Sequence, residues 1–190
     1  MKKLKEAIKK FWDYLKKDTW DSWLVSILLV FVVIKFILFP FLSLVTGTSL
    51  PLVVVESCSM YHESSFDNWW SSNSLLYEQF NINKSTFKSY PFKSGLNKGD
   101  IILTWGYSTY KKGDVIIFSA PTKYPIIHRV MSESPLETKG DHNLGQLDVE
   151  HNIQNDVVIG KAIVRIPLLG WLKLIFFEPM KPAEQRGFCK

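Results

Sequence analysis

The first 46 residues carry two different hydrophobic patterns. Over residues 1–21, apolar side chains recur at helical spacing and leave a lysine-rich opposite face, which predicts an amphipathic helix at a membrane interface. Residues 22–46 are almost wholly apolar, with Lys35 as their one charged side chain, and are long enough to cross a hydrocarbon layer of about 30 Å. We therefore predict one transmembrane helix over residues 22–46, kinked near its end by Pro40. The alternative for residues 1–21 is a solvated helix packed on the rest of the protein.

Positive charges are distributed unevenly about this apolar segment. Seven lysines precede it, whereas residues 46–82 contain no lysine or arginine. Because positively charged flanks stay on the cytoplasmic side, we expect a cytoplasmic N-terminus and a single pass through a cell membrane or an endoplasmic-reticulum membrane. Everything after residue 46 is then extracytoplasmic. A charge near the bilayer centre is costly, so we expect Lys35 to reach the interface or to meet a partner subunit.

After residue 46 the pattern changes to short β-branched runs separated by turn residues. Such runs predict strands, at 52–55, 100–105, 114–119, 126–131 and 157–166. Three Lys-Gly-Asp triplets mark turns beside them. We predict a mostly β, antiparallel domain over residues 47–178, with an insertion at 61–97 that forms short helices or loops, and a tail at 179–190. The apolar segment 168–177 is too short to span a membrane, so it either dips into the interface or packs beneath the β domain.

Composition narrows the function classes. The net charge of +5 comes largely from the lysine-rich N-terminal helix, so it indicates a lipid surface rather than nucleic acid. Two cysteines are too few for a disulfide scaffold or a cysteine-based metal site. The chain has no glycine-rich phosphate loop, no CxxC pair and no HExxH helix. We therefore expect neither a metal nor an organic cofactor.

The residues left for chemistry are a serine, a histidine and two carboxylates. Ser59 follows the first predicted strand, and His128 lies within a later one. A serine becomes a nucleophile when a base within hydrogen-bond reach removes its proton. Asp141 and Asp148, in the loop after that strand, could orient the imidazole. Taken singly, each of these residues is more often structural than catalytic, so the hypothesis depends on their combination.

Their order along the chain resembles the type I signal peptidases, and more narrowly the archaeal and endoplasmic-reticulum branch. The motifs that carry this resemblance cover about residues 22–60 and 98–171. They are a membrane span, a strand into Ser59-Met60, Gly99-Asp100-Ile101-Ile102, Gly113-Asp114-Val115-Ile116, Ile127-His128-Arg129-Val130, Thr138-Lys139-Gly140-Asp141 and the run from Val158 to Trp171.

The resemblance implies a signal-peptidase-like β fold and a Ser/His/Asp mechanism, because His128 stands where the bacterial branch has lysine. By motif, Ser59 is then the nucleophile and His128 the general base. The family's triad acid falls at position 147, which is leucine here, so we expect Asp148 in that role with a loop one residue longer. Asp141 is expected to support the site, and the Ser57 hydroxyl to join the oxyanion hole.

Two features depart from the family pattern. Cys58 replaces the usual glycine between the serines, and Tyr61-His62 replaces the usual acid-proline pair. A Cys58 nucleophile is an alternative, although strand alternation would turn its side chain away from Ser57 and Ser59. The insertion at 61–97 is also unusual, and we expect it to cover or rim the substrate cleft.

The resemblance implies a membrane-bound serine endopeptidase that cleaves N-terminal signal peptides from secreted and membrane preproteins. Its partners would be those preproteins and the lipid bilayer. Two alternatives stay open. One is a catalytically inactive, membrane-tethered β domain that serves as an assembly subunit or binding module. The other keeps proteolysis but uses Lys123 or Lys139 as the base.

Overall fold

The N-terminal unit of the protein consists of helices. The computed structural model describes residues 2–107 and 109–190, which divide into one unit up to Val45 and a second from Thr46. Helix α1 (Lys2–Leu15) buries no residue, so its apolar face is uncovered. Helix α2 (Trp20–Val33) follows. A hydrogen bond links the two helices, in which the Ser22 hydroxyl of α2 donates to the Tyr14 carbonyl of α1 over 2.9 Å.

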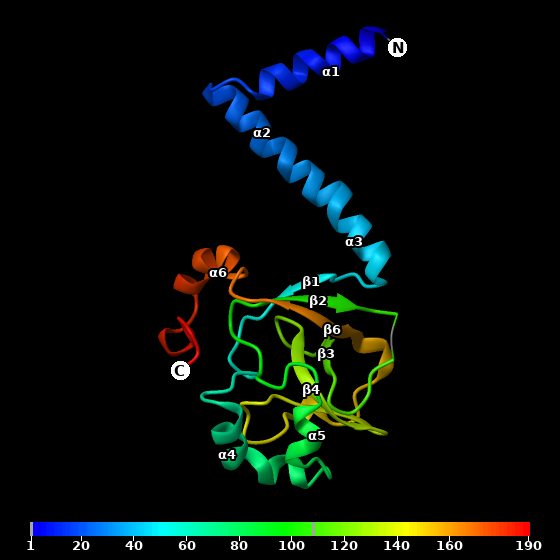
Figure 1. Ribbon diagram of the computed structural model, residues 1–190, viewed down its shortest axis with the longest axis vertical. Coiled ribbons are helices and arrows are strands. Elements are labelled where there is room, and N and C mark those ends of the chain that lie inside the picture. The colour runs from blue at the N-terminus through cyan, green and yellow to red at the C-terminus, as the bar shows by residue number, and fades with distance from the viewer. Residues whose placement is uncertain (1, 108) are drawn as a thin grey trace. The chain divides into compact units, whose positions relative to one another are not determined.

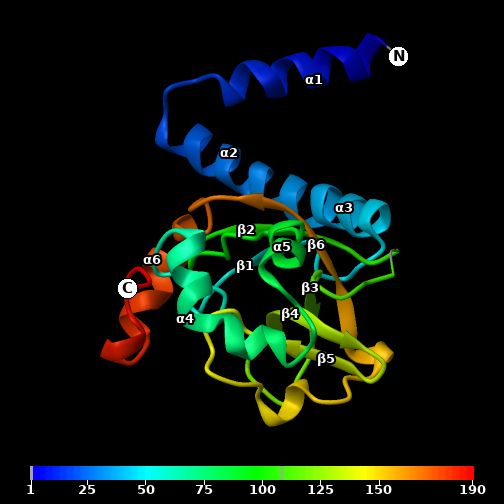
Figure 2. The ribbon, with the colours of Figure 1, turned by 60° about the horizontal axis from the view of Figure 1, so that its bottom comes forward.

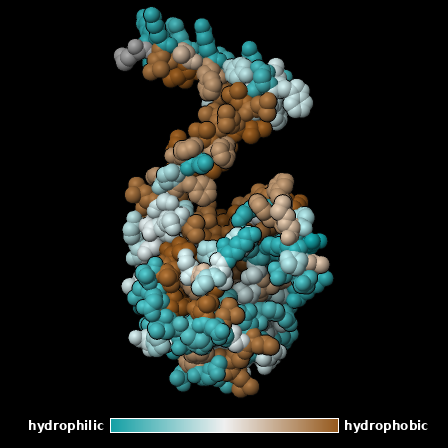
Figure 3. All heavy atoms as spheres, turned by 180° about the vertical axis from the view of Figure 1, so that it is seen from behind, coloured by the Kyte–Doolittle hydropathy of each residue, from teal (hydrophilic) through white to brown (hydrophobic). Residues whose placement is uncertain are grey.

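Helix α2 continues without a break to Thr46. The π-helical turn η1 (Ile34–Leu38) and helix α3 (Phe39–Thr46) complete a helix of 27 residues that is long and apolar enough to cross a membrane. Figure 3 shows apolar side chains along it and hydrophilic ones on α1. Pro40 has no N–H to donate to the carbonyl four residues earlier, and the helix widens just before it, where the Phe39 N–H reaches Ile34.

The second unit is built on one six-stranded antiparallel sheet with the strand order β1-β2-β6-β3-β4-β5 (Figure 1). The strands are β1 (Leu52–Val54), β2 (Ile101–Trp105), β3 (Val115–Phe118), β4 (Ile126–Glu133), β5 (Leu136–Lys139) and β6 (Val158–Ile166). The antiparallel prediction is confirmed. The prediction of a mostly β chain is not clearly supported, because helical residues outnumber strand residues in the described chain.

Two local differences from the sequence prediction bear on function. Strand β5 was not predicted, since Leu-Glu-Thr-Lys lacks a β-branched run, yet it pairs with β4 along most of its length. Strand β1 ends at Val54, so residues 57–60 form a bend and a turn rather than a continuation of the strand. Strand alternation therefore does not determine the direction of the Cys58 side chain.

The insertion forms helices α4 (Phe66–Glu78) and α5 (Lys84–Lys88), which lie beside β4 in Figure 1 and come forward in Figure 2. Its aromatic residues form a cluster with Met131 of β4, here called the aromatic cluster. The buried members are Trp69, Trp70, Tyr77, Ile82, Phe87 and Met131. Met131 and Arg129 alternate along β4 with His128, so the insertion packs on the face of β4 opposite His128.

The C-terminal segment is tied back to the sheet domain. It begins with helix α6 (Trp171–Phe177), in which Leu174 is buried while several other apolar side chains are exposed, and continues through short 3-10 turns at Glu178–Met180 and Ala183–Gln185. Cys189 forms a disulfide with Cys58. This bond was not predicted, because nothing in two cysteines 131 positions apart indicates that they meet.

Candidate functional site

His128 is oriented by a buried carboxylate. Its imidazole lies on β4 with 3% of its surface exposed, and its Nδ1 is 2.5 Å from Oε1 of Glu150, which is fully buried. A carboxylate only accepts, so Nδ1 carries the proton, and within the described residues no hydrogen bond is made by Nε2, which is left as the accepting nitrogen. The Thr138 hydroxyl donates to the same Glu150 oxygen over 2.9 Å. This arrangement fixes both the tautomer and the direction of the ring.

The carboxylate that meets His128 is thus Glu150, not the predicted Asp148. Both lie in the 3-10 turn η2 (Asp148–Glu150), which follows Leu147. Oε2 of Glu150 accepts the Leu147 N–H over 2.7 Å, and this cap turns the Glu150 side chain inward. Asp148 is exposed to solvent. Glu150 was not predicted, because the position of the acid was taken from its usual spacing after Asp141 in the family. That spacing does not reveal a turn capped by the Glu150 side chain.

The Ser59 backbone and the His128 ring both approach Gly140. A Cβ placed on Gly140 would be 2.7 Å from the Ser59 carbonyl oxygen and 2.8 Å from His128 Nε2, so both groups approach the same point. No larger residue fits there without displacing one of them. The His142 N–H also donates to the Ser59 carbonyl, over 2.8 Å. The loop at 140–142 therefore sets the position of the Ser59 backbone beside the free imidazole nitrogen.

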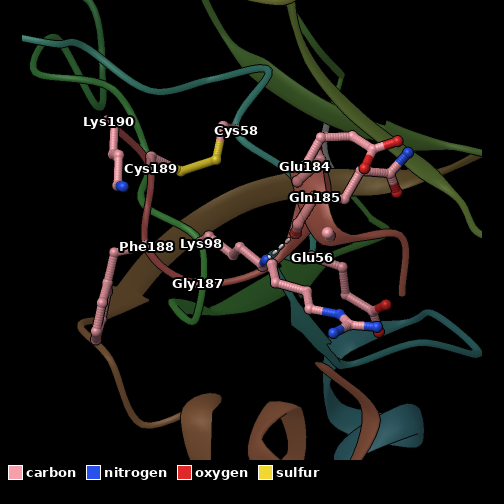
Figure 4. Close-up of a pocket in the computed structure, with 12 residues that line it drawn as sticks. Glu56, Cys58, Lys98, Glu184, Gln185, Gly187, Phe188, Cys189 and Lys190 are labelled. Atoms are coloured by element: carbon pink, nitrogen blue, oxygen red, sulfur yellow. Dashed lines mark hydrogen bonds between the residues drawn. A yellow bond between two sulfur atoms is a disulfide. The ribbon is translucent and has the colours of Figure 1, made fainter. Parts of the chain in front are cut away.

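The Ser59 hydroxyl is engaged with a neighbour. Its Oγ is 3.1 Å from Ser57 Oγ, and within the described residues no hydrogen bond joins it to His128. Loose catalytic hydrogen bonds are common in proteins without substrate and tighten in the complex. Ser57 also lines a cavity of about 500 Å³ whose other wall is the C-terminal tail (Figure 4).

Cys58 is not available as a thiol. Figure 4 shows its bond to Cys189 beside Lys98, whose Nζ donates to the Gln185 carbonyl over 2.6 Å. A sulfur held in a disulfide is no nucleophile in this state, so the alternative of a Cys58 nucleophile is not supported. The bond instead fastens the tail to the residue that precedes Ser59.

Asp141 lies at the centre of a buried polar cluster. Arg129 Nη2 reaches its Oδ2 over 2.7 Å and Arg129 Nε reaches its Oδ1 over 2.9 Å. His62 Nε2 lies 3.0 Å from Oδ2, and the Tyr77 hydroxyl donates to Oδ1 over 2.9 Å. Burial alone would raise the pKa of Asp141, but the charge of Arg129 and these hydrogen bonds hold it well below its usual range. Asp141 is therefore held as an anion at neutral pH, and within the described residues its carboxylate is bonded to Arg129, His62 and Tyr77 rather than to His128.

The two lysines considered as bases differ in environment. Lys123 is exposed, and its Nζ lies over the Tyr124 ring. Lys139 is buried, which lowers its pKa from 10.5 to about 8. Its Nζ donates to the Gly140 carbonyl over 2.9 Å and lies 5.0 Å from the centre of the Tyr77 ring. Lys139 thus faces the aromatic cluster, on the Arg129 side of the sheet.

The arrangement brings together the elements of general-base activation. A buried carboxylate holds one nitrogen of His128, and the other nitrogen lies beside Gly140, in the loop that contacts the Ser59 backbone. An imidazole held in this way can take a hydroxyl proton and later return it to a leaving group. The geometry is therefore compatible with nucleophilic catalysis by Ser59.

Comparison with known proteins points in the same direction. Over 97 residues the chain is 28% identical to the signal peptidase complex catalytic subunit SEC11 of Colletotrichum graminicola, an alignment that covers 43% of this chain and 56% of that protein. The chain thus spans just over half the length of this relative. No protein-family model matches the chain. The similarity supports the type I signal peptidase family and does not distinguish its branches.

Proposed function

We propose that this protein is a membrane-anchored serine endopeptidase that removes N-terminal signal peptides from secreted and membrane preproteins. Ser59 is the nucleophile and His128 the general base. Glu150 takes the role expected of Asp148 and holds the imidazole, while Ser57 contributes its hydroxyl to the oxyanion hole. The observation that supports the proposal is that the Ser59 carbonyl and His128 Nε2 approach the same point at Gly140.

The proposed topology is a single pass with a cytoplasmic N-terminus. Seven lysines precede the apolar helix, which supports this orientation. The Cys58–Cys189 disulfide supports it independently, because disulfides persist in oxidising compartments outside the cytosol. The site then works on the far side of a cell membrane or an endoplasmic-reticulum membrane. The relative is named as a subunit of a complex, so a partner subunit near Lys35 is part of the proposal.

The substrate is an extended peptide with small residues before the cleaved bond. Strands β1 and β5 are the two edges of the sheet, and each leads to the site: β1 toward Ser59, and β5 into the Gly140 loop. A peptide that adds to a sheet edge through backbone hydrogen bonds would run past the nucleophile. Shallow pockets would then reject large side chains by steric conflict.

Substitution of the nucleophile tests the proposal directly. The full chain in detergent or liposomes is incubated with a labelled preprotein, as wild type, as Ser59→Ala and as Ser64→Ala, an exposed serine of the insertion that serves as the control. We expect Ser59→Ala to lower cleavage at least about 10³-fold, because only the wild-type hydroxyl forms the covalent intermediate. Ser64→Ala should cleave as the wild type does.

Two results would count against this function. Cleavage by a folded Ser59→Ala protein at the wild-type rate excludes Ser59 as the nucleophile. Binding of preproteins without cleavage by the wild type favours the inactive β domain instead.

A further inference from the structure

Two of the groups that hold Asp141 belong to the insertion. His62 lies at the start of the insertion and Tyr77 in α4, and both donate to the Asp141 carboxylate. All three side chains are buried. The insertion therefore does more than pack its aromatic side chains against β4. It supplies two of the three side chains that fix this aspartate.

The Asp141 backbone is part of the loop that touches the proposed catalytic pair. The Asp141 N–H points to the Met60 sulfur over 3.4 Å, directly after Ser59. The residue before Asp141, Gly140, lies close to the Ser59 carbonyl and to His128 Nε2. The residue after it, His142, donates its N–H to the same Ser59 carbonyl. The Asp141 side chain is therefore anchored within the loop that contacts both Ser59 and His128.

Both ends of the insertion also meet at Met60. The Leu96 N–H donates to the Met60 carbonyl over 2.8 Å. A Cβ on Gly95, which has a φ of +73°, would lie 2.4 Å from that carbonyl and 2.7 Å from the His62 ring. The ring of His62 is stacked on Trp69 with 3.6 Å between centres, so the imidazole has little freedom to move. The insertion is thus closed tightly around the residue that follows the nucleophile.

The donors from the insertion add hydrogen bonds to a carboxylate that already faces a cation. Arg129 already balances Asp141, and its guanidinium also donates to the carbonyls of Pro91, Phe92 and Gly113. Within the described residues His62 Nδ1 is buried without a hydrogen-bond partner, so this ring bonds to Asp141 through Nε2 alone. The hydrogen bonds of His62 and Tyr77 therefore fix the direction of the carboxylate.

We propose that His62 and Tyr77 are positioning residues that set the distance between Ser59 and His128 by holding Asp141 and its loop. The role of the insertion is then support from behind the sheet. The expected effect on kcat rests on the proposed function. The expected effect on the position of the His128 ring does not, and it can be measured without any substrate.

The kinetic test compares variants of the full chain in detergent. His62→Phe keeps a ring on Trp69 but removes the donor to Asp141, and we expect kcat to fall about 10- to 100-fold with KM within threefold of the wild type. His62→Gln restores a donor and should recover most of kcat. Tyr77→Phe removes one hydroxyl and should lower kcat about 3- to 10-fold. Tyr90→Phe is the control, because Tyr90 packs against the same aromatic cluster without bonding to Asp141.

The second test reads the His128 ring directly. The chain has four histidines, so ring nitrogen spectra of the protein labelled with ¹⁵N-histidine are simple enough to assign. We expect the His128 signals to shift in His62→Phe and Tyr77→Phe, and to match the wild type in His62→Gln and Tyr90→Phe. Unchanged His128 signals in both His62→Phe and Tyr77→Phe overturn the inference, as does a kcat within twofold of the wild type in both.

The two tests separate this inference from the proposed function. If the wild type cleaves no preprotein, the proposed function fails, and the spectra alone decide whether the insertion positions His128. Tyr77→Phe is nearly isosteric, so it gives an answer even where His62→Phe does not fold. A protein that loses activity while His128 is unmoved has lost it for another reason, and that outcome also overturns the inference.

Discussion

Asp141 and Glu150 are two fully buried carboxylates in the segment that follows β5, yet their charges are balanced in different ways. Asp141 faces the guanidinium of Arg129, so its negative charge has a permanent counter-charge. Glu150 faces a histidine, a threonine hydroxyl and a backbone N–H, none of which is a fixed cation. Arg129 and His128 are neighbours on β4 and point to opposite faces, which separates the two carboxylates.

This difference distinguishes a structural carboxylate, Asp141, from one that can take part in proton transfer, Glu150. A carboxylate paired with arginine holds its surroundings in place at every ordinary pH, because neither partner changes its charge. A carboxylate against an imidazole becomes part of an ion pair only when the ring takes up a proton, which is what a general base does during the reaction. The Asp141 side of the sheet is therefore expected to determine stability, and the Glu150 side to determine turnover.

The largest expected effect follows from Glu150→Gln. A glutamine amide can donate to His128 Nδ1 and so favours the tautomer with its proton on Nε2, which cannot accept a proton from Ser59. We expect kcat to fall roughly 10³- to 10⁴-fold, or about 4–5.5 kcal/mol in the barrier, with little change in the unfolding midpoint. Steady-state kinetics of preprotein cleavage measures the first quantity and thermal unfolding in detergent the second.

Asp148→Asn is the matched control for this change. It lies two residues away in the same turn, but its side chain is exposed. Its cleavage rate should be within about threefold of the wild type. A larger loss for Asp148→Asn than for Glu150→Gln would return the triad role to Asp148.

Asp141→Asn should affect stability more than any other single change in this comparison. It leaves Arg129 buried without its counter-charge, and we expect a loss of about 3–5 kcal/mol in the free energy of unfolding at neutral pH. Because the pKa of Asp141 is lower in the folded protein than its ordinary 3.8, its contribution is present above that value and is lost as the pH falls below it. Denaturant unfolding of the full chain at several pH values measures both effects.

The difference between wild type and Asp141→Asn should therefore shrink on acidification below about pH 4. Asp67→Asn is the control, since Asp67 pairs with Lys84 and Lys88 at the surface, where solvent screens the pair, and it should contribute far less to the free energy of unfolding. Equal losses for the two variants would show that Asp141 is not the anchor inferred from its contacts.

The smallest expected effect concerns Lys139, the second buried cation near Asp141. Burial lowers its pKa from 10.5 to about 8, so its charge costs stability below pH 8, and that cost is relieved as the pH rises toward 10.5. The free energy of unfolding of the wild type should therefore rise over this window by on the order of 1–3 kcal/mol relative to Lys139→Met. A pH-independent difference between the two proteins would contradict a charged, buried Lys139.

The local parts of this structure were largely predictable. The apolar helix, the antiparallel strands around His128 and the helices of the insertion follow from hydrophobic patterning, which depends on neighbours a few residues apart. Strand β5 was missed because its stability comes from pairing with β4 rather than from its own side chains. The packing of the insertion against β4 could not be predicted either, because it depends on Arg129 and Met131 facing the aromatic cluster.

The site was predictable only as far as residue types and their order. Ser59 and His128 stand out by motif, but which carboxylate meets His128 depends on a turn that caps itself through Glu150. The partner of Cys58 depends on the path of the last ten residues across the domain.

The amino-acid sequence by itself determined the apolar helix, the strand pattern and the set of candidate side chains, because these depend on local spacing and on side-chain chemistry. Only the tertiary structure decided which groups meet: Glu150 with His128, His62 and Tyr77 with Asp141, and Cys58 with Cys189. These contacts join residues from 22 to 131 positions apart. Their geometry depends on how turns and strands close in space, and hydrophobic periodicity carries no information about that closure.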